Sequence, residues 1–178
     1  MKKALLIASV LFIAVISTAC INNIAVQELN SKAAEFMQKG DYEAAINRLE
    51  ASIDLDSTMY ETYYNLGIAA TNAKKYERAI NAINNGIKIK PDFADFYYSL
   101  GVAQAEFADA LLEESIYDSE KEQTLKKDVS EEDQLKSKEL KKSAIENLKK
   151  YLELKPQAED KETVEELINN CSENEDKE

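Results

Sequence analysis

The stretch YYNLG at Tyr63–Gly67 returns as YYSLG at Tyr97–Gly101, thirty-four residues further along this chain of 178 residues. The same offset relates Tyr42 to Tyr76. A fixed period of this length is typical of a solenoid of helical hairpins, in which a single unit cannot bury its apolar face alone. The sequence therefore predicts an all-α repeat protein.

The middle copy of the repeat has the apolar spacing of two consecutive helices. Its first apolar stripe, at i, i+3, i+4 and i+7, consists of Tyr63, Leu66, Gly67 and Ala70. Its second stripe consists of Tyr76, Ala79, Ile80, Ile83 and Ile87, and Pro91 ends it. Gly67 and Ala79 are small, which allows two helices to approach closely. This copy is therefore expected to form a packed helix pair.

The repeat resembles the tetratricopeptide repeat family. The matching positions of the middle copy are Leu66, Gly67, Tyr76, Ala79 and Pro91, and Tyr63 stands where the family usually has Trp. A first copy starts near Val26, with Ser57 in place of the proline. A third copy starts at Ala94, and its second half comes late, at Ala144–Pro156. The resemblance implies a right-handed helical solenoid of three repeats, at about 26–59, 60–93 and 94–157.

The third repeat contains an insertion. Gly67 to Ala79 spans twelve residues, whereas Gly101 to Ala144 spans forty-three. The extra residues, about 109–140, contain no Pro or Gly and are rich in Glu, Lys, Gln and Leu, so we expect a long helical arm made of two overlong helices. Ser130 and the acid three residues later resemble an N-cap, which places the turn near 128–130. This arm is either a solvated hairpin or a second docking surface.

The segment after Pro156 has one more helical stripe, formed by Val164, Leu167, Ile168 and Cys171. We expect a capping helix at about 158–171, because a terminal repeat exposes an apolar side that needs cover. The repeat domain would then span 26–171. Residues 172–178 are polar and acidic and are expected to form a disordered tail.

The N-terminus has the anatomy of an export signal. Lys2 and Lys3 precede the apolar run Ala4–Ile16, which is too short for a membrane span. The following Ser-Thr-Ala-Cys resembles the end of a bacterial lipoprotein signal, although Ser17 stands where most such signals have an aliphatic residue. The resemblance implies a signal peptide at 1–19, acylation of Cys20, and a short tether at 20–25. An ordinary cleaved signal or an uncleaved anchor are the alternatives.

Composition argues against several classes of function. The chain has 22 basic and 34 acidic residues, and this excess of acidic residues disfavours nucleic-acid binding. It has no His, no glycine-rich phosphate loop and no calcium loop. We therefore expect no enzyme, no catalytic residue, no metal, no cofactor and no small-molecule substrate. Cys171, on an apolar stripe, is expected to be a packed residue rather than a redox site.

The resemblance also implies a concave groove that is lined by the first helix of each repeat and holds an extended peptide or a partner helix. The groove residues are expected to be Asn30, Ala34, Met37, Glu61, Tyr64, Asn65, Ile68, Asp95, Tyr98 and Val102. Chaperone-binding family members hold a terminal carboxylate with Lys, Asn and Arg. In this chain Asn30 and Ala34 occupy the first-repeat positions where those members have Lys and Asn. Asp95 and Ser99 stand in the third repeat, where those members have cationic residues. We therefore predict a neutral-to-basic peptide or an amphipathic helix as ligand, unless the tyrosines only pack between repeats.

The favoured hypothesis is a lipid-anchored protein-protein interaction scaffold of the bacterial cell envelope, facing the periplasm or the cell surface, in an assembly or secretion complex. One alternative is a periplasmic chaperone-like holder of exported polypeptides. Another is a structural spacer that docks through the inserted arm.

Overall fold

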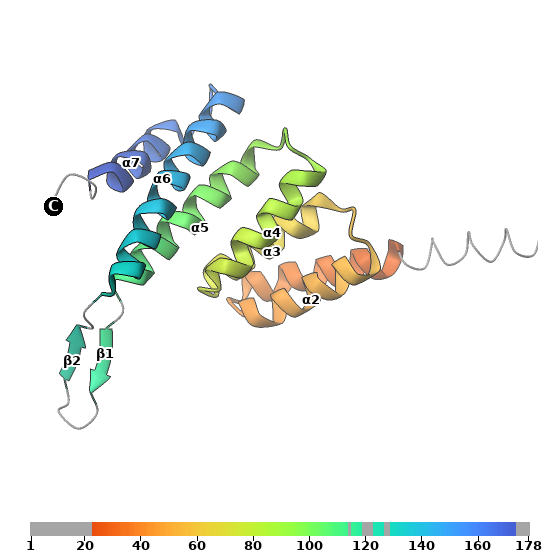
Figure 1. The fold of residues 1–178 in the computed structure, drawn as a ribbon. Coiled ribbons are helices and arrows are strands. Elements are labelled where there is room, and N and C mark those ends of the chain that lie inside the picture. The colour runs from red at the N-terminus through yellow and green to blue at the C-terminus, as the bar shows by residue number, and fades with distance from the viewer. Residues whose placement is uncertain (1–22, 114, 119–122, 127–128, 174–178) are drawn as a thin grey trace, which may run out of the picture.

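The computed structural model describes residues 23–113, 115–118, 123–126 and 129–173 (Figure 1). Residues 23–38 are helical. The helices that follow are α2 (Tyr42–Leu55), α3 (Tyr60–Asn72), α4 (Tyr76–Ile89), α5 (Ala94–Leu112), α6 (Glu131–Leu154) and α7 (Lys161–Glu173). Consecutive helices fold back on one another and form three hairpins that stack along the molecule. The helical solenoid that the repeat predicts is confirmed.

The turns of the first two hairpins use the same backbone conformation. Gly40 has a φ of 74°, and Lys74, thirty-four residues later, has a φ of 57°. Glycine adopts this left-handed region freely, whereas a residue with a Cβ loses about 1–2 kcal/mol there. The first turn is also better capped, because Asp41 accepts a hydrogen bond from the amide of Ala44. The second turn is therefore the more strained of the two.

Small residues hold the two helices of a hairpin close together. A Cβ on Gly67 would lie 2.4 Å from Cγ1 of Ile83, and a Cβ on Gly101 would lie 2.7 Å from Cγ of Leu148. The backbone carbonyl of Ala144 is 3.2 Å from the same point on Gly101. The late segment of the third repeat thus packs on α5 as α4 packs on α3, even though the sequence from Gly101 to Ala144 is thirty-one residues longer than that from Gly67 to Ala79.

An aromatic cluster joins the second repeat to the third. Phe96 is fully buried, and its ring fills the space left by Gly86 on α4. The edges of three other rings surround it, those of Tyr60, Tyr64 and Phe93, at centroid distances of 5.3–6.3 Å. This packing fixes the position of α5 relative to α3.

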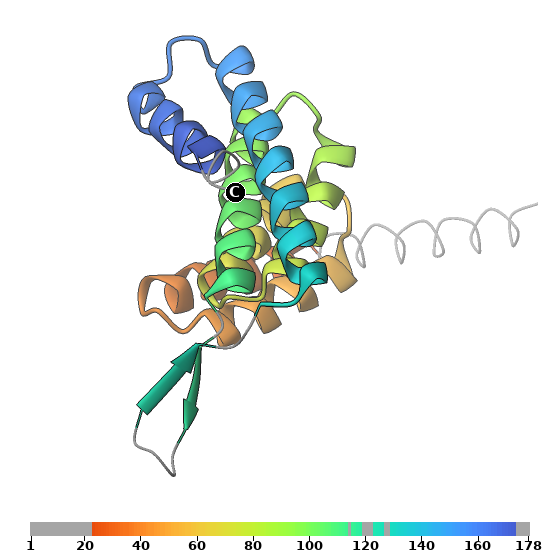
Figure 2. The same cartoon turned by 60° about the vertical axis from the view of Figure 1, so that its left-hand side comes forward.

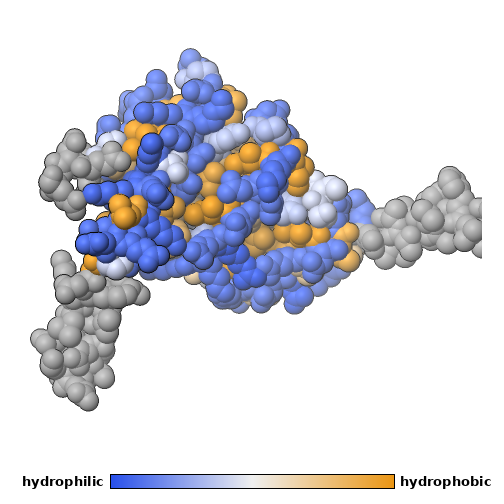
Figure 3. Space-filling view, viewed as in Figure 1, coloured by the Kyte–Doolittle hydropathy of each residue, from blue (hydrophilic) through white to orange (hydrophobic). Residues whose placement is uncertain are grey.

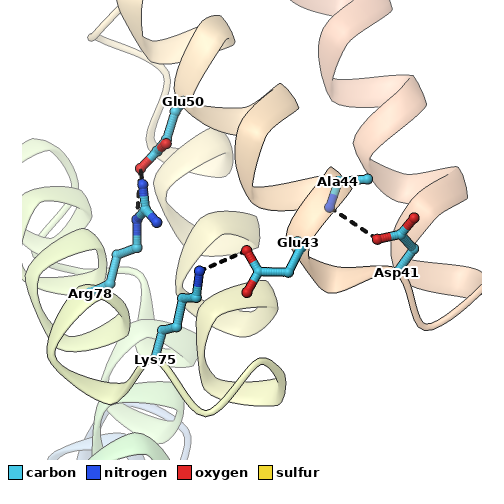
Figure 4. A network of polar contacts seen from close by, with 6 residues as sticks. All are labelled: Asp41, Glu43, Ala44, Glu50, Lys75 and Arg78. Carbon is cyan, nitrogen blue, oxygen red and sulfur yellow. Dashed lines mark hydrogen bonds and ion pairs between the residues drawn. The ribbon is translucent and has the colours of Figure 1, made fainter.

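Ion pairs link the second helices of successive repeats. Two pairs, Glu43–Lys75 and Glu50–Arg78, join α2 to α4 and its N-cap (Figure 4). A third pair, Glu77–Lys136, joins α4 to the start of α6. These side chains are largely solvent-exposed, so each pair contributes at most about 1 kcal/mol. On the face seen in Figure 3, narrow hydrophobic bands lie between hydrophilic ridges. This surface is that of a solvated protein whose apolar area is divided into strips.

The insertion in the third repeat differs from the expected helical arm. α5 and α6 are long, with 19 and 24 residues against 13 and 14 for α3 and α4. Between them, however, β1 (Ser115–Asp118) and β2 (Gln123–Lys126) form an antiparallel hairpin that projects from the helices (Figures 1 and 2). The prediction of a helical arm is therefore wrong for these residues. Both strands contain residues with strand preference, and a helix without a packing partner is marginal in water.

The base of the insertion is firmly held. Ser130 caps α6 by accepting a hydrogen bond from the amide of Asp133 at 3.1 Å. Ser137 donates a hydrogen bond of 2.9 Å to the carbonyl of Ala108. The buried ammonium of Lys141 lies 2.8 Å from Asp109, whose carboxylate is more than half exposed. The Ser137–Ala108 and Lys141–Asp109 contacts join α5 to α6 near the strands.

α7 covers the outer side of the third repeat (Figure 2). Val164 packs with Leu148 and Tyr151, and Cys171 packs with Ala105 and is buried as a free thiol. No helix within the described ranges is long and apolar enough to span a bilayer. The predicted signal peptide, Cys20 and most of the acidic tail lie outside the described residues.

Candidate functional site

The first helices of the second and third repeats form a hollow of about 240 Å³ between them. Its lining consists of Tyr64, Ile68, Thr71, Asn72, Tyr98, Ser99, Val102 and Glu106. Four residues predicted for the groove are thus brought together, two from α3 and two from α5. The hollow is mainly apolar, with hydroxyl and amide groups at its sides. An arrangement of this kind can hold an apolar side chain of a ligand and hydrogen-bond its backbone.

Tyr64 is held in place by aromatic packing. Its ring lies 5.4 Å from that of Phe93 and 5.8 Å from that of Phe96, both nearly edge-on. Burial, and then the nearby carboxylate of Asp95, raises the pKa of the Tyr64 phenol, which also hydrogen-bonds Ser99. The phenol therefore stays protonated and presents a fixed polar group at the edge of the hollow.

Tyr98 and Asp95 are both engaged by α6. The ring of Tyr98 lies 5.4 Å from that of Tyr151, at an angle of 50°. Lys155 forms an ion pair with Asp95 and lies 5.5 Å from the centroid of the Tyr151 ring. The carboxylate expected to repel acidic ligands is thus partly neutralised by a lysine sixty residues away in sequence.

The first repeat contributes little to the hollow. Asn30 donates hydrogen bonds to the hydroxyl of Ser52 (2.8 Å) and to the carbonyl of Val26 (2.9 Å), and it accepts one from Thr62. Its amide therefore joins the first helix to α2 and α3. Ala34 is exposed, and Met37 packs against the hydrophobic core.

Two further predicted residues, Glu61 and Asn65, lie on α3 but do not line the hollow; Glu61 is exposed and Asn65 is half-buried. The structure therefore gathers the expected groove residues from the second and third repeats only.

Glu106 marks the point where this hollow meets a second one, of about 400 Å³. The second hollow is lined by Lys74, Tyr76, Glu106, Asp109, Ala110 and Glu113. Burial raises the pKa of the Glu106 carboxyl, and the ammonium of Lys74 opposes this shift. The sequence analysis did not select Glu106. Its spacing of four residues from Val102, and of eight from Tyr98, could have placed it on the same face of α5.

The site has the chemistry of a contact surface. Among the described residues there is no group of three or more His, Cys, Asp or Glu side chains placed to hold a metal ion. Tyr63, next to Tyr64 in sequence, faces a different hollow that it shares with Leu66 and Arg78. The two neighbouring tyrosines thus line different hollows, and only Tyr64 belongs to the candidate site.

Comparison with known proteins concerns the fold. The family described as TPR repeat matches residues 33–70 and 71–106. The TPR2B domain of yeast Sti1, solved in a pHsp70 complex, superposes with a TM-score of 0.63 and 16% identity over 85% of this chain and 98% of that one. The first TPR of Spaghetti (RPAP3), bound to the HSP90 peptide SRMEEVD, superposes with a TM-score of 0.60. Its sequence is 16% identical, and the match covers 83% of this chain and 90% of that one.

A bacterial structure is similar to the same extent. The Yersinia enterocolitica type III secretion chaperone SycD, in complex with a peptide of the translocator YopD, gives a TM-score of 0.58 and 19% identity over 84% of this chain and 94% of that one. No curated protein matches the sequence significantly. At these identities the structural likeness establishes the fold.

Proposed function

Residues 33–106 match the family described as TPR repeat, and on this basis we propose that the chain is a protein-protein interaction scaffold that binds a peptide or helix of a partner in the hollow between α3 and α5. The observation that carries the proposal is this hollow, in which Tyr64, Ile68, Tyr98 and Val102 meet around hydroxyl and amide groups. Two of the similar structures are described as complexes with peptides. Repeat proteins of this fold are typically interaction modules rather than enzymes.

The expected ligand is neutral to basic. The lining of the hollow contains one carboxylate, Glu106, and neither Lys nor Arg. The nearby Lys155 is paired with Asp95. An acidic peptide such as SRMEEVD, which is bound by one of the similar structures, would find no free cation in this lining. A ligand with apolar and basic side chains fits it better.

The scaffold is anchored to a membrane of the bacterial cell envelope through acylated Cys20. The charged, apolar and small-residue order of residues 2–20 supports this part of the proposal. Two residues lie between Cys20 and residue 23, which is already helical, so these three chain steps would place the start of the repeats within about 11 Å of the acylated residue. Intact-mass analysis of the protein from membranes should show a chain that begins at Cys20 and carries acyl groups. An unmodified mass would refute the anchor.

The groove is tested by affinity capture from detergent-solubilised envelopes. The wild type is compared with Tyr64→Ala/Tyr98→Ala, and the matched control is Tyr63→Ala/Tyr97→Ala, which changes the other tyrosine of each motif. Circular dichroism verifies that both variants fold. A discrete partner that is lost with the first variant and retained with the control supports the groove. Equal recovery by all three proteins would refute it.

Docking through the insertion is the second candidate, and the projecting hairpin of β1 and β2 favours it. Its strand edges could pair with a strand of a partner. Replacing residues 115–126 with a short Gly/Ser linker should then abolish capture while the Tyr64/Tyr98 variant still captures the partner. The opposite pattern assigns the binding to the groove.

A further inference from the structure

The two hollows described above form one continuous track along α5. The apolar hollow has Tyr98 and Val102 on α5, and the acidic hollow has Asp109 on the same helix and Glu113 directly after its end. Glu106 lines both. These residues follow one another at intervals of three or four, so they share one face of the helix. A ligand that runs along α5 would therefore pass from an apolar to an acidic environment.

The acidic part of the track has features that suit a cationic side chain. Its lining combines three carboxylates with one ammonium, that of Lys74. Glu106, Asp109 and Glu113 are all exposed, and Asp109 is in addition held by the buried ammonium of Lys141. Tyr76, which stacks on Phe107 at a centroid distance of 5.5 Å, adds an aromatic ring to the lining. An aromatic ring flanked by carboxylates attracts Lys and Arg.

The distance between the two parts sets the spacing of the ligand. Val102 lies in the apolar hollow and Asp109 in the acidic one, seven residues apart on α5. At about 1.5 Å per residue, this separation is about 10 Å. An extended peptide advances about 3.3 Å per residue and covers this distance in about three residues.

We propose that the track recognises a polypeptide segment in which an apolar side chain is followed, about three residues later, by a lysine or arginine. The apolar side chain enters the hollow beside Tyr64 and Tyr98, and the basic side chain lies against Glu106 and Glu113. This inference rests on the proposed function of the groove. It defines the ligand by the spacing of its apolar and basic side chains. It gives Glu106 and Glu113 the role of selecting a basic side chain, rather than a role in the stability of the fold.

The test uses the purified full chain and short synthetic Gly/Ser peptides, with affinities measured by titration calorimetry. The peptides contain Leu-x-x-Lys, Leu-x-x-Glu, Ala-x-x-Lys or, with a longer separation, Leu-x-x-x-x-x-Lys. The wild type should bind the Leu-x-x-Lys peptide about tenfold more tightly than the Leu-x-x-Glu peptide. Glu106→Gln/Glu113→Gln should lose this preference. Glu162→Gln/Glu166→Gln, which removes the same charge from exposed positions on α7, should keep it.

The outcomes separate the inference from the proposed function. If the Glu106/Glu113 variant retains the full preference for lysine, the inference is overturned, while the groove remains supported as long as the Tyr64/Tyr98 variant weakens binding. If lysine at any distance from leucine binds equally well, the proposed spacing is wrong. If no peptide binds, both the inference and the peptide-binding groove are refuted.

Discussion

Replacing Gly86 with alanine should destabilise the protein, although alanine is the better helix former. The added methyl carbon would lie 2.1 Å from Cζ and 2.3 Å from Cε1 of Phe96. Phe96 has no exposed surface, and the rings of Tyr60, Tyr64 and Phe93 prevent it from moving aside. Helix propensity favours alanine by about 1 kcal/mol. Overpacking costs about 1–3 kcal/mol, and a contact this short lies at the upper end of that range. We therefore expect a net loss of about 2 kcal/mol.

Urea unfolding followed by circular dichroism gives the midpoint and slope from which this loss is obtained. Phe96→Leu provides the control, because a smaller side chain opposite Gly86 removes the cause of the clash. In that background Gly86→Ala should cost much less, and the difference is the coupling energy of a double-mutant cycle. If Gly86→Ala leaves the midpoint unchanged, or if its cost is the same in both backgrounds, the ring of Phe96 does not occupy the space at Gly86. The account of how the second and third repeats join would then be wrong.

Three further predictions concern stability. Lys74→Gly should raise the free energy of unfolding by about 1 kcal/mol, because a φ of 57° strains any residue with a Cβ; an unchanged urea midpoint would contradict this. Asp109→Ala should lower the free energy of unfolding by about 2 kcal/mol, because it leaves the buried Lys141 ammonium unpaired. The loss is smaller than for a fully buried pair because the Asp109 carboxylate is more than half exposed. In a Lys141→Met background the same change should be nearly neutral in the same titration. Burial and the hydrogen bond donated to Asp160 raise the pKa of Tyr151, so the folded state keeps a proton that the unfolded state releases above about pH 10. Stability should therefore be lost as the pH rises through this range, and Tyr151→Phe should show a smaller loss in urea titrations at pH 9 to 11.

The fold could be read from the sequence wherever packing repeats. Small residues recur at a fixed spacing because each must meet an equivalent partner in the next helix. Gly67 meets Ala79 and Ile83, and Gly101 meets Ala144 and Leu148. The insertion has no such constraint. Its overall composition favours helix, but the residues of β1 and β2 pair with each other as antiparallel strands.

The site could be predicted only in part, for a similar reason. The resemblance to the tetratricopeptide repeat family implied that Tyr64 and Tyr98 line one groove, and the structure brings them into one hollow. The position of Asn30 in its repeat suggested a ligand contact, yet its hydrogen bonds go to residues 22 and 32 positions away. The pairing of Lys155 with Asp95 spans sixty positions. Such contacts depend on which helices become neighbours, and the spacing within one helix carries no information about them.

The contact of Gly101 with Leu148 and Ala144 has a consequence for how this scaffold can be altered. Since that contact fixes the third repeat, the connection between α5 and α6 can lengthen without shifting either helix. The free energy of closing a loop rises by only about 0.6 kcal/mol for each doubling of its length, so going from the 3 residues between α3 and α4 to the 18 residues between α5 and α6 costs about 1.5 kcal/mol. The connection between α5 and α6 should therefore tolerate inserted residues. A reporter peptide or an entire small domain placed between Leu112 and Glu131 should leave the hollow between α3 and α5 intact.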